Sequence, residues 1–151
     1  MFSITIKKLR VILLIFTPIN VLLSIQMADF GVQFPFFLIQ SINGSVSFIP
    51  VTSDIDLLFS HVYKNAIALS ALFWIFAACI LAAAILFFLI TYGKMKTSSK
   101  RTGLIIILSG LFFLVSSMIN YSTLLSIPNI LIVPIGIPIL LVVGFYICRK
   151  G

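Results

Sequence analysis

The chain has 151 residues, of which 62% are hydrophobic and 9% charged, and its formal net charge is +7. Soluble domains carry about 25% charged residues, so this composition argues against a soluble protein and favours one that lies in a lipid bilayer. The basic residues form short clusters beside apolar runs rather than an aromatic-interleaved face. No nucleic-acid partner is therefore expected.

The first apolar run extends from about residue 9 to residue 27 and is preceded by Lys7, Lys8 and Arg10. Basic residues before an apolar stretch fit either a secretory signal peptide or a retained transmembrane helix. The run is longer than a usual signal core and lacks a small residue three places before Ala28, which favours a retained helix. Pro18 lacks a backbone N–H, so a kink is expected there.

The segment from about residue 28 to residue 63 is expected to be an outer loop with a β-hairpin at 36–49. Asn43-Gly44 stands between two apolar runs, and this dipeptide favours a type I′ turn because both positions need positive φ. The loop is expected either to cap the helices or to form a partner surface. The candidate partner-surface residues are Phe34, Phe36, Phe37 and Phe48.

Two triplets match the glycan acceptor pattern, and they begin at Asn43 and Asn120. Asn43 lies at the predicted hairpin tip, where a sugar is feasible. The turn chemistry of Asn-Gly explains the same residue without a glycan, so both interpretations stay open.

Three further apolar runs follow, at about 65–92, 102–120 and 129–148, with a short basic loop at 93–101 between the first two. Each is long enough to cross the hydrocarbon core as a helix. Pro134 and Pro138 are expected to bend the last run. The sequence thus predicts an all-α integral membrane protein, a four-transmembrane-helix (tetraspan) bundle in one domain over 1–151, with a small extracytoplasmic hairpin between helices one and two.

Nine of the ten basic residues fall on one side of this four-crossing arrangement, and only Lys64 falls on the other. Cytoplasmic loops are enriched in Lys and Arg. The prediction is a multi-pass protein of the cell membrane with both termini in the cytoplasm.

Small residues recur along two of the predicted spans and mark helix-packing candidates, because small side chains let helix backbones approach closely. Helix two is therefore expected to pack on helix three. The candidates are Ala71, Ala78 and Ala82 in the second span and Gly103, Gly110 and Ser117 in the third.

Few residues suggest chemistry. Asp54, Asp56 and His61 could hold a divalent cation, but a role of Asp54 as the cap of a short helix at 56–63 is the preferred interpretation. There is no Glu and no nucleophile–base set. Cys79 and Cys148 lie at different predicted depths, so no disulfide is expected. No catalytic, cofactor-binding or metal residues, no cofactor and no enzyme activity are predicted.

Function is expected to be that of a non-catalytic accessory or assembly subunit of a larger membrane complex, with the outer hairpin as the partner surface. Its partners would be the lipid bilayer and other membrane subunits or a second copy. One alternative is a small oligomeric channel or transporter, with Asn20 and the serines of helix three facing the axis. The other is an envelope or adhesion protein. Neutral polar groups within the spans more often bond between helices than line a pore.

The order of elements, with inner termini, a large first outer loop that contains β-structure and a short second outer loop, resembles the layout of claudin-like proteins. Their outer-loop signature of tryptophan, glycine, leucine and paired cysteines is absent, because residues 28–63 contain neither Cys nor Trp. The resemblance is therefore one of layout.

Overall fold

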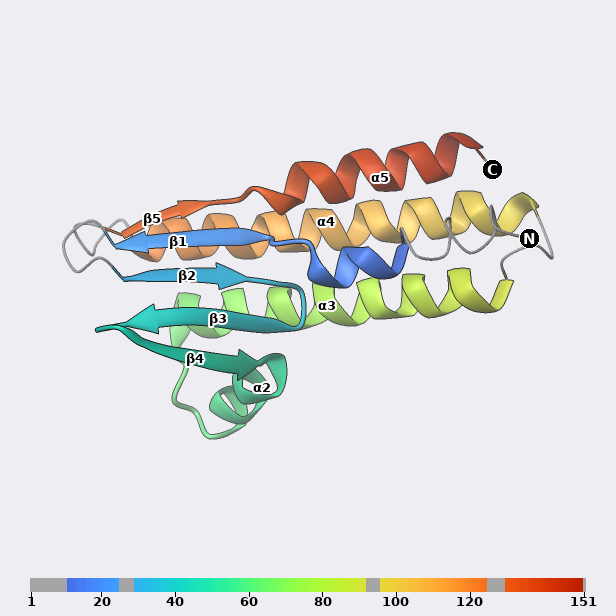
Figure 1. The fold of residues 1–151 in the computed structure, drawn as a ribbon. Helices are drawn as coiled ribbons and strands as arrows, with labels where there is room; N and C mark the ends of the chain where they lie inside the picture. The colour runs from blue at the N-terminus through green and yellow to red at the C-terminus, as the bar shows by residue number, and fades with distance from the viewer. Residues whose placement is uncertain (1–10, 25–28, 92–95, 125–129, 151) are drawn as a thin grey trace.

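The computed structural model describes residues 11–24, 29–91, 96–124 and 130–150. These residues form a mixed α/β fold in which an antiparallel sheet lies beside one end of a long helical hairpin (Figure 1). In chain order the elements are η1 (Leu13–Phe16), β1 (Asn20–Ser24), β2 (Phe30–Gln33), β3 (Phe37–Ile42), β4 (Ser45–Pro50), α2 (Val51–Phe59), α3 (Asn65–Thr91), α4 (Lys96–Leu124), β5 (Ile130–Val133) and α5 (Gly136–Lys150).

The all-α, four-span prediction is wrong. The described residues contain a five-stranded sheet and four α-helices, and only α3 and α4 are long and apolar enough to cross a membrane by length and composition. The first expected span, at 9–27, contains η1 and β1, and the fourth, at 129–148, contains β5 and α5. The tetraspan description fails with them.

Proline explains where both of these runs leave the helical conformation. Pro18 follows η1, and the residue before it, Thr17, is extended at φ −74° and ψ 118°, as the ring of a following proline favours. Pro134 stands directly after β5 in the same way. The two strands then pair with each other, Val21 opposite Val133, so each satisfies backbone groups of the other.

The two central apolar runs are confirmed as helices. The run expected at 65–92 is α3, and the run expected at 102–120 lies inside α4, which begins earlier, at Lys96. Residues 96–101, expected in a loop, are therefore helical, while 92–95 lie outside the described residues. With 27 residues, α3 is about 40 Å long at 1.5 Å per residue.

The hairpin at 36–49 is also confirmed, with β3 and β4 as its arms and Asn43 and Gly44 at φ 51° and 77°. The prediction fell short because the hairpin is part of a larger sheet of order β4-β3-β2-β1-β5. The carboxylate of Asp29 accepts a hydrogen bond from the Asn43 backbone N–H at 2.9 Å, which ties the turn to the start of β2.

Of the small residues expected to pack α4 on α3, Gly103 and Gly110 lie against α5 instead, and Ser117 donates a hydrogen bond to Asn20 of β1. A Cβ on Gly103 would come within 2.5 Å of the Cys148 nitrogen, and one on Gly110 would lie 3.1 Å from a methyl of Leu141. The contact between α3 and α4 is made elsewhere and includes the rings of Trp74 and Phe113, whose centroids are 4.6 Å apart. Of the alanines expected in that contact, Ala78 is buried and Ala71 and Ala82 are half-buried.

Gly103→Leu should force α4 and α5 apart, because the atoms that its Cβ would meet are backbone atoms of Gly144 and Cys148. Overpacking of this kind costs about 1–3 kcal/mol. We expect a lower midpoint of thermal unfolding in detergent, followed by circular dichroism. The control is Leu108→Ala at an exposed position of the same helix, and an equal midpoint for both variants would contradict the close approach.

Candidate functional site

The two faces of the sheet differ in chemistry. Side chains alternate across a strand, so the strand residues that line the space toward the helices define one face and their neighbours the other. We call the first the cavity face. It is formed by Asn20, Leu22, Gly31, Gln33, Leu38, Gln40, Ile42, Ser45, Ser47, Ile49 and Ile132.

We call the opposite side the free face. It is apolar except for one serine, and most of its larger side chains are exposed, with Val46 at 73% and Phe48 at 62%. Its members are Val21, Leu23, Phe30, Val32, Phe37, Ile39, Ser41, Val46, Phe48, Pro50, Leu131 and Val133.

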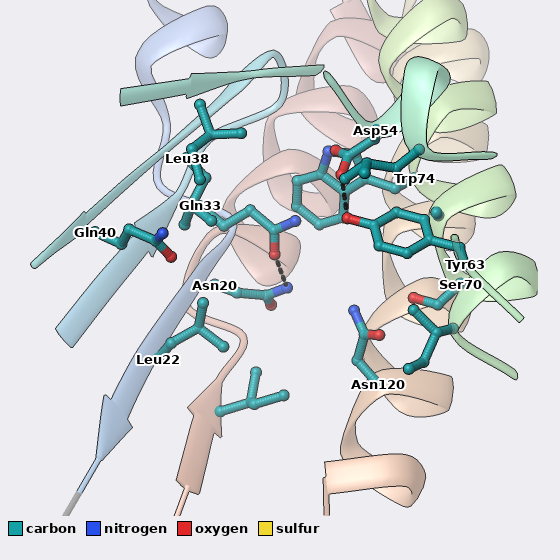
Figure 2. A pocket seen from close by; sticks show the side chains of 15 residues that line it. Asn20, Leu22, Gln33, Leu38, Gln40, Asp54, Tyr63, Ser70, Trp74 and Asn120 are labelled. Atoms are coloured by element: carbon teal, nitrogen blue, oxygen red, sulfur yellow. Dashed lines mark hydrogen bonds between the residues drawn. The ribbon is translucent and has the colours of Figure 1, made fainter. Parts of the chain in front are cut away.

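A cavity of about 340 Å³ separates the cavity face from α2, α3 and α4 (Figure 2). This volume lies within the range of about 300–1,000 Å³ that small-molecule sites occupy. Polar groups reach it from several elements: Asn20, Gln33 and Gln40 come from the sheet, and Ser70 and Asn120 from the long helices. Trp74 and several aliphatic side chains complete the lining.

Asn20 is the buried junction between the sheet and α4. Its side chain is 1% exposed, accepts a hydrogen bond from Ser117 Oγ at 3.0 Å, and donates from Nδ2 to Gln33 Oε1 at 3.1 Å. The adjacent residue, Ile19, donates its backbone N–H to Gln33 and accepts from Gly136. The sheet, α4 and the start of α5 therefore meet at one point.

The serines of α4 hold the helices together. Ser70 and Ser116 each donate to the other's backbone carbonyl, at 3.1 and 2.9 Å, and Ser109 donates to the Ala77 carbonyl at 2.8 Å. The prediction that these neutral polar groups bond between helices is confirmed.

Asp54 and Tyr63 form the ionisable corner of the cavity. Tyr63 donates its phenolic hydrogen to Asp54 Oδ1 at 3.0 Å. Burial raises the pKa of the Asp54 carboxyl, while the hydrogen bond from Tyr63 works in the lowering direction. Burial, the charge of Asp54 and the hydrogen bond to it together raise the pKa of Tyr63 to about 12.

The structure separates the residues that the sequence placed in one candidate cation site. The helix here is α2, which begins at Val51 with Pro50 as its N-cap, and no side chain caps it. Asp54 faces Tyr63, whereas Asp56 and His61 are exposed. Among the described residues, no three His, Cys, Asp or Glu side chains are grouped as metal ligands would be.

The four candidate phenylalanines divide between two surroundings. Phe37, on the free face, stacks on Phe34 at a centroid distance of 4.5 Å and contacts the tilted ring of Phe48 at 5.0 Å. Phe36 instead packs against the buried core. Asn43 is exposed at the hairpin tip, whereas Asn120 lines the cavity.

Sequence reasoning missed Gln33, Gln40 and Tyr63. Strand pairing brings the two glutamines to the same face as Asn20, and the expected helix at 9–27 concealed that pairing. Tyr63 is nine residues from Asp54 and reaches it only because the chain turns back after α2. The alternation of polar and apolar residues in 45–48 was the one available signal for Gln40, because the predicted hairpin places Gln40 opposite Ser47.

A scan against models of protein families finds no match to this chain. A search of curated proteins finds no matching sequence either.

Asn20→Ala and Ser117→Ala should each lower stability by about 1–3 kcal/mol, because each leaves a buried polar group without its partner. The double variant should cost less than the sum, since one interaction is removed twice. Chemical denaturation in detergent measures the three values. Additive losses would show that the 3.0 Å contact between the two side chains carries no coupling.

Tyr63 should ionise near pH 12 rather than near 10. Its folded-state pKa lies above the unfolded value, so its contribution to stability is complete below pH 10 and is lost as the pH rises toward 12. Phenolate absorbance followed against pH, wild type minus Tyr63→Phe, isolates this group. Asp54→Asn should lower the pH at which half of Tyr63 is ionised. An unchanged value would contradict the contribution of the carboxylate charge.

Proposed function

We propose that the protein is a non-catalytic, membrane-embedded assembly subunit, and that the free face of its sheet stacks on the same face of a second copy. The observation that carries the proposal is the chemistry of the free face. Eleven of its twelve side chains are apolar and none is charged, and the aromatic cluster around Phe37 adds to it. Exposed apolar patches of this kind mark interaction sites.

The surfaces of α3 and α4 support a location in the lipid bilayer. In an apolar 18-residue stretch of each helix, only 39% of α3 and 44% of α4 is buried inside the protein, whereas a core helix of a soluble protein is mostly buried. Large apolar side chains point outward along both helices, and soluble monomers rarely carry so large an exposed patch. Examples are Leu72, Phe76, Leu86 and Ile90 on α3 and Leu104, Leu111, Val115 and Met118 on α4.

The charges support an orientation for this pair of helices. Lys100, Arg101 and Arg149 lie at the end away from the sheet (Figure 1), whereas Asp29, Asp54 and Asp56 lie at the sheet end. Basic residues accumulate on the cytoplasmic side. In the proposed arrangement the sheet is therefore extracytoplasmic, and the connection from α3 to α4 is cytoplasmic.

A second copy fits the free face by symmetry. The strands run roughly parallel to α3 and α4 (Figure 1), so a two-fold axis along the membrane normal is also roughly parallel to the strands. That axis brings the free faces of two identically inserted copies together, as an isologous interface requires. Face-to-face sheets pack about 10 Å apart. The middle strand, β2, would then lie nearest the axis.

The test is cysteine cross-linking in isolated, carbonate-washed membranes, in a chain whose native Cys79 and Cys148 are replaced by alanine. Val32→Cys, on the free face of β2, should be joined into a dimer by a short bis-maleimide, because facing sheets about 10 Å apart are too far separated for a direct disulfide. Ser47→Cys, exposed on the cavity face, is the matched control and should remain monomeric.

Adding Ile39→Asp to the Val32→Cys chain should abolish the cross-link, because a carboxylate would then be buried in an apolar interface. Equal cross-linking of Val32→Cys and Ser47→Cys would contradict the proposal. So would its absence from Val32→Cys, which would leave lipid or a different protein as the cover of the free face.

A further inference from the structure

The cavity on the other side of the sheet has a separate set of properties, and the inference drawn from it does not depend on dimer formation. Its position places it between layers rather than on a surface, with β1–β4, α2, α3 and α4 all contributing to the lining. A site that so many elements hold is positioned by the fold rather than by one loop.

The charge balance of the cavity favours a cation. Asp54 is its one acidic residue, and among the described residues no Lys, Arg or His lines it. The carboxylate has room for more donors, because Tyr63 uses one of its roughly four acceptor positions. An anionic ligand would meet this carboxylate without a compensating charge.

The lining distinguishes an organic cation from a metal ion. Ca²⁺ takes about 6–8 oxygen ligands, carboxylates among them, and Mg²⁺ is usually held together with substrate phosphates, whereas the cavity offers a single carboxylate. It does offer the aromatic rings of Tyr63 and Trp74, and ring faces attract ammonium groups. The side-chain amides on the sheet side add further acceptors.

We propose that this cavity binds a small organic ammonium group, with the Asp54 carboxylate as its counter-ion and Tyr63 and Trp74 as its aromatic walls (Figure 2). Burial of Asp54 makes its ionised form costly, and a bound cation offsets that cost. The ammonium group can belong to a lipid headgroup or to a free amine, because the recognition chemistry is the same.

Trp74 is the only tryptophan in the chain and lines the cavity, so its fluorescence reports on the site directly. The purified protein in an uncharged maltoside detergent is titrated with choline chloride, against sodium chloride at matched ionic strength. We expect a saturable change in Trp74 emission with choline and none with sodium. The uncharged isostere 3,3-dimethylbutanol should give no saturable change.

Asp54→Asn should weaken choline binding at least tenfold, because it removes the counter-ion and keeps an oxygen acceptor for Tyr63. Asp56→Asn is the matched control, two residues along the same helix and exposed, and should bind as the wild type does. Three results would overturn the proposal: no saturable response of the wild type, an equal response to the isostere, or an unchanged response of Asp54→Asn. If Asp54→Asn does not fold, the comparison with the isostere decides alone.

Vesicles separate the two sources of the ammonium group. The wild type is reconstituted into phosphatidylglycerol alone and into mixtures with phosphatidylethanolamine. A headgroup ligand should shift Trp74 emission in the mixture before choline is added and raise the choline concentration needed for half-saturation. A free-amine ligand should give the same choline titration in both membranes.

Discussion

The side chain of Asn20 is the constraint on which the rest of the arrangement depends. It is almost completely buried, so its amide must find partners inside the protein, and it finds them in Ser117 of α4 and Gln33 of β2. This fixes the start of β1 beside α4. Every other strand is placed by its pairing to β1, directly or through a neighbour. The cavity is thus positioned by one buried amide and the ladder that follows from it.

The sheet reverses the usual distribution of side chains on its outer face, which is apolar, and places amides among the aliphatic residues of its inner face. An antiparallel sheet with one covered face normally turns its apolar residues toward the core and its polar residues outward. Here the amides of Gln33 and Gln40 face inward, while Phe48 and Val46 face outward. The inner polar groups need donors, acceptors or a ligand, and the outer apolar groups need a cover. Both proposed interactions follow from this distribution.

The sequence was sufficient for elements whose signals are local. The uncharged run of α3 and the Asn43-Gly44 turn each carry their whole signal in consecutive residues, and both were predicted. The strands β1 and β5 were not, because an apolar window records hydrophobicity without distinguishing a helix from a strand whose partner is distant. Asn20 stood out as a polar residue in an apolar run, yet Ser117 lies 97 positions away, and no spacing rule reaches that far. Asp54 was noticed for the wrong reason, since its partner proved to be Tyr63.

The pairing of β1 with β5 also sets an order of events in synthesis. These strands are joined by backbone hydrogen bonds although more than a hundred residues separate Val21 from Val133. Contacts of such high sequence separation form late and slowly. While the ribosome is still adding α4, β1 has an unsatisfied edge, and exposed edges invite pairing with other chains. Strand β5 therefore closes the open edge of β1, and the sheet is complete only after α4 and β5 have been made.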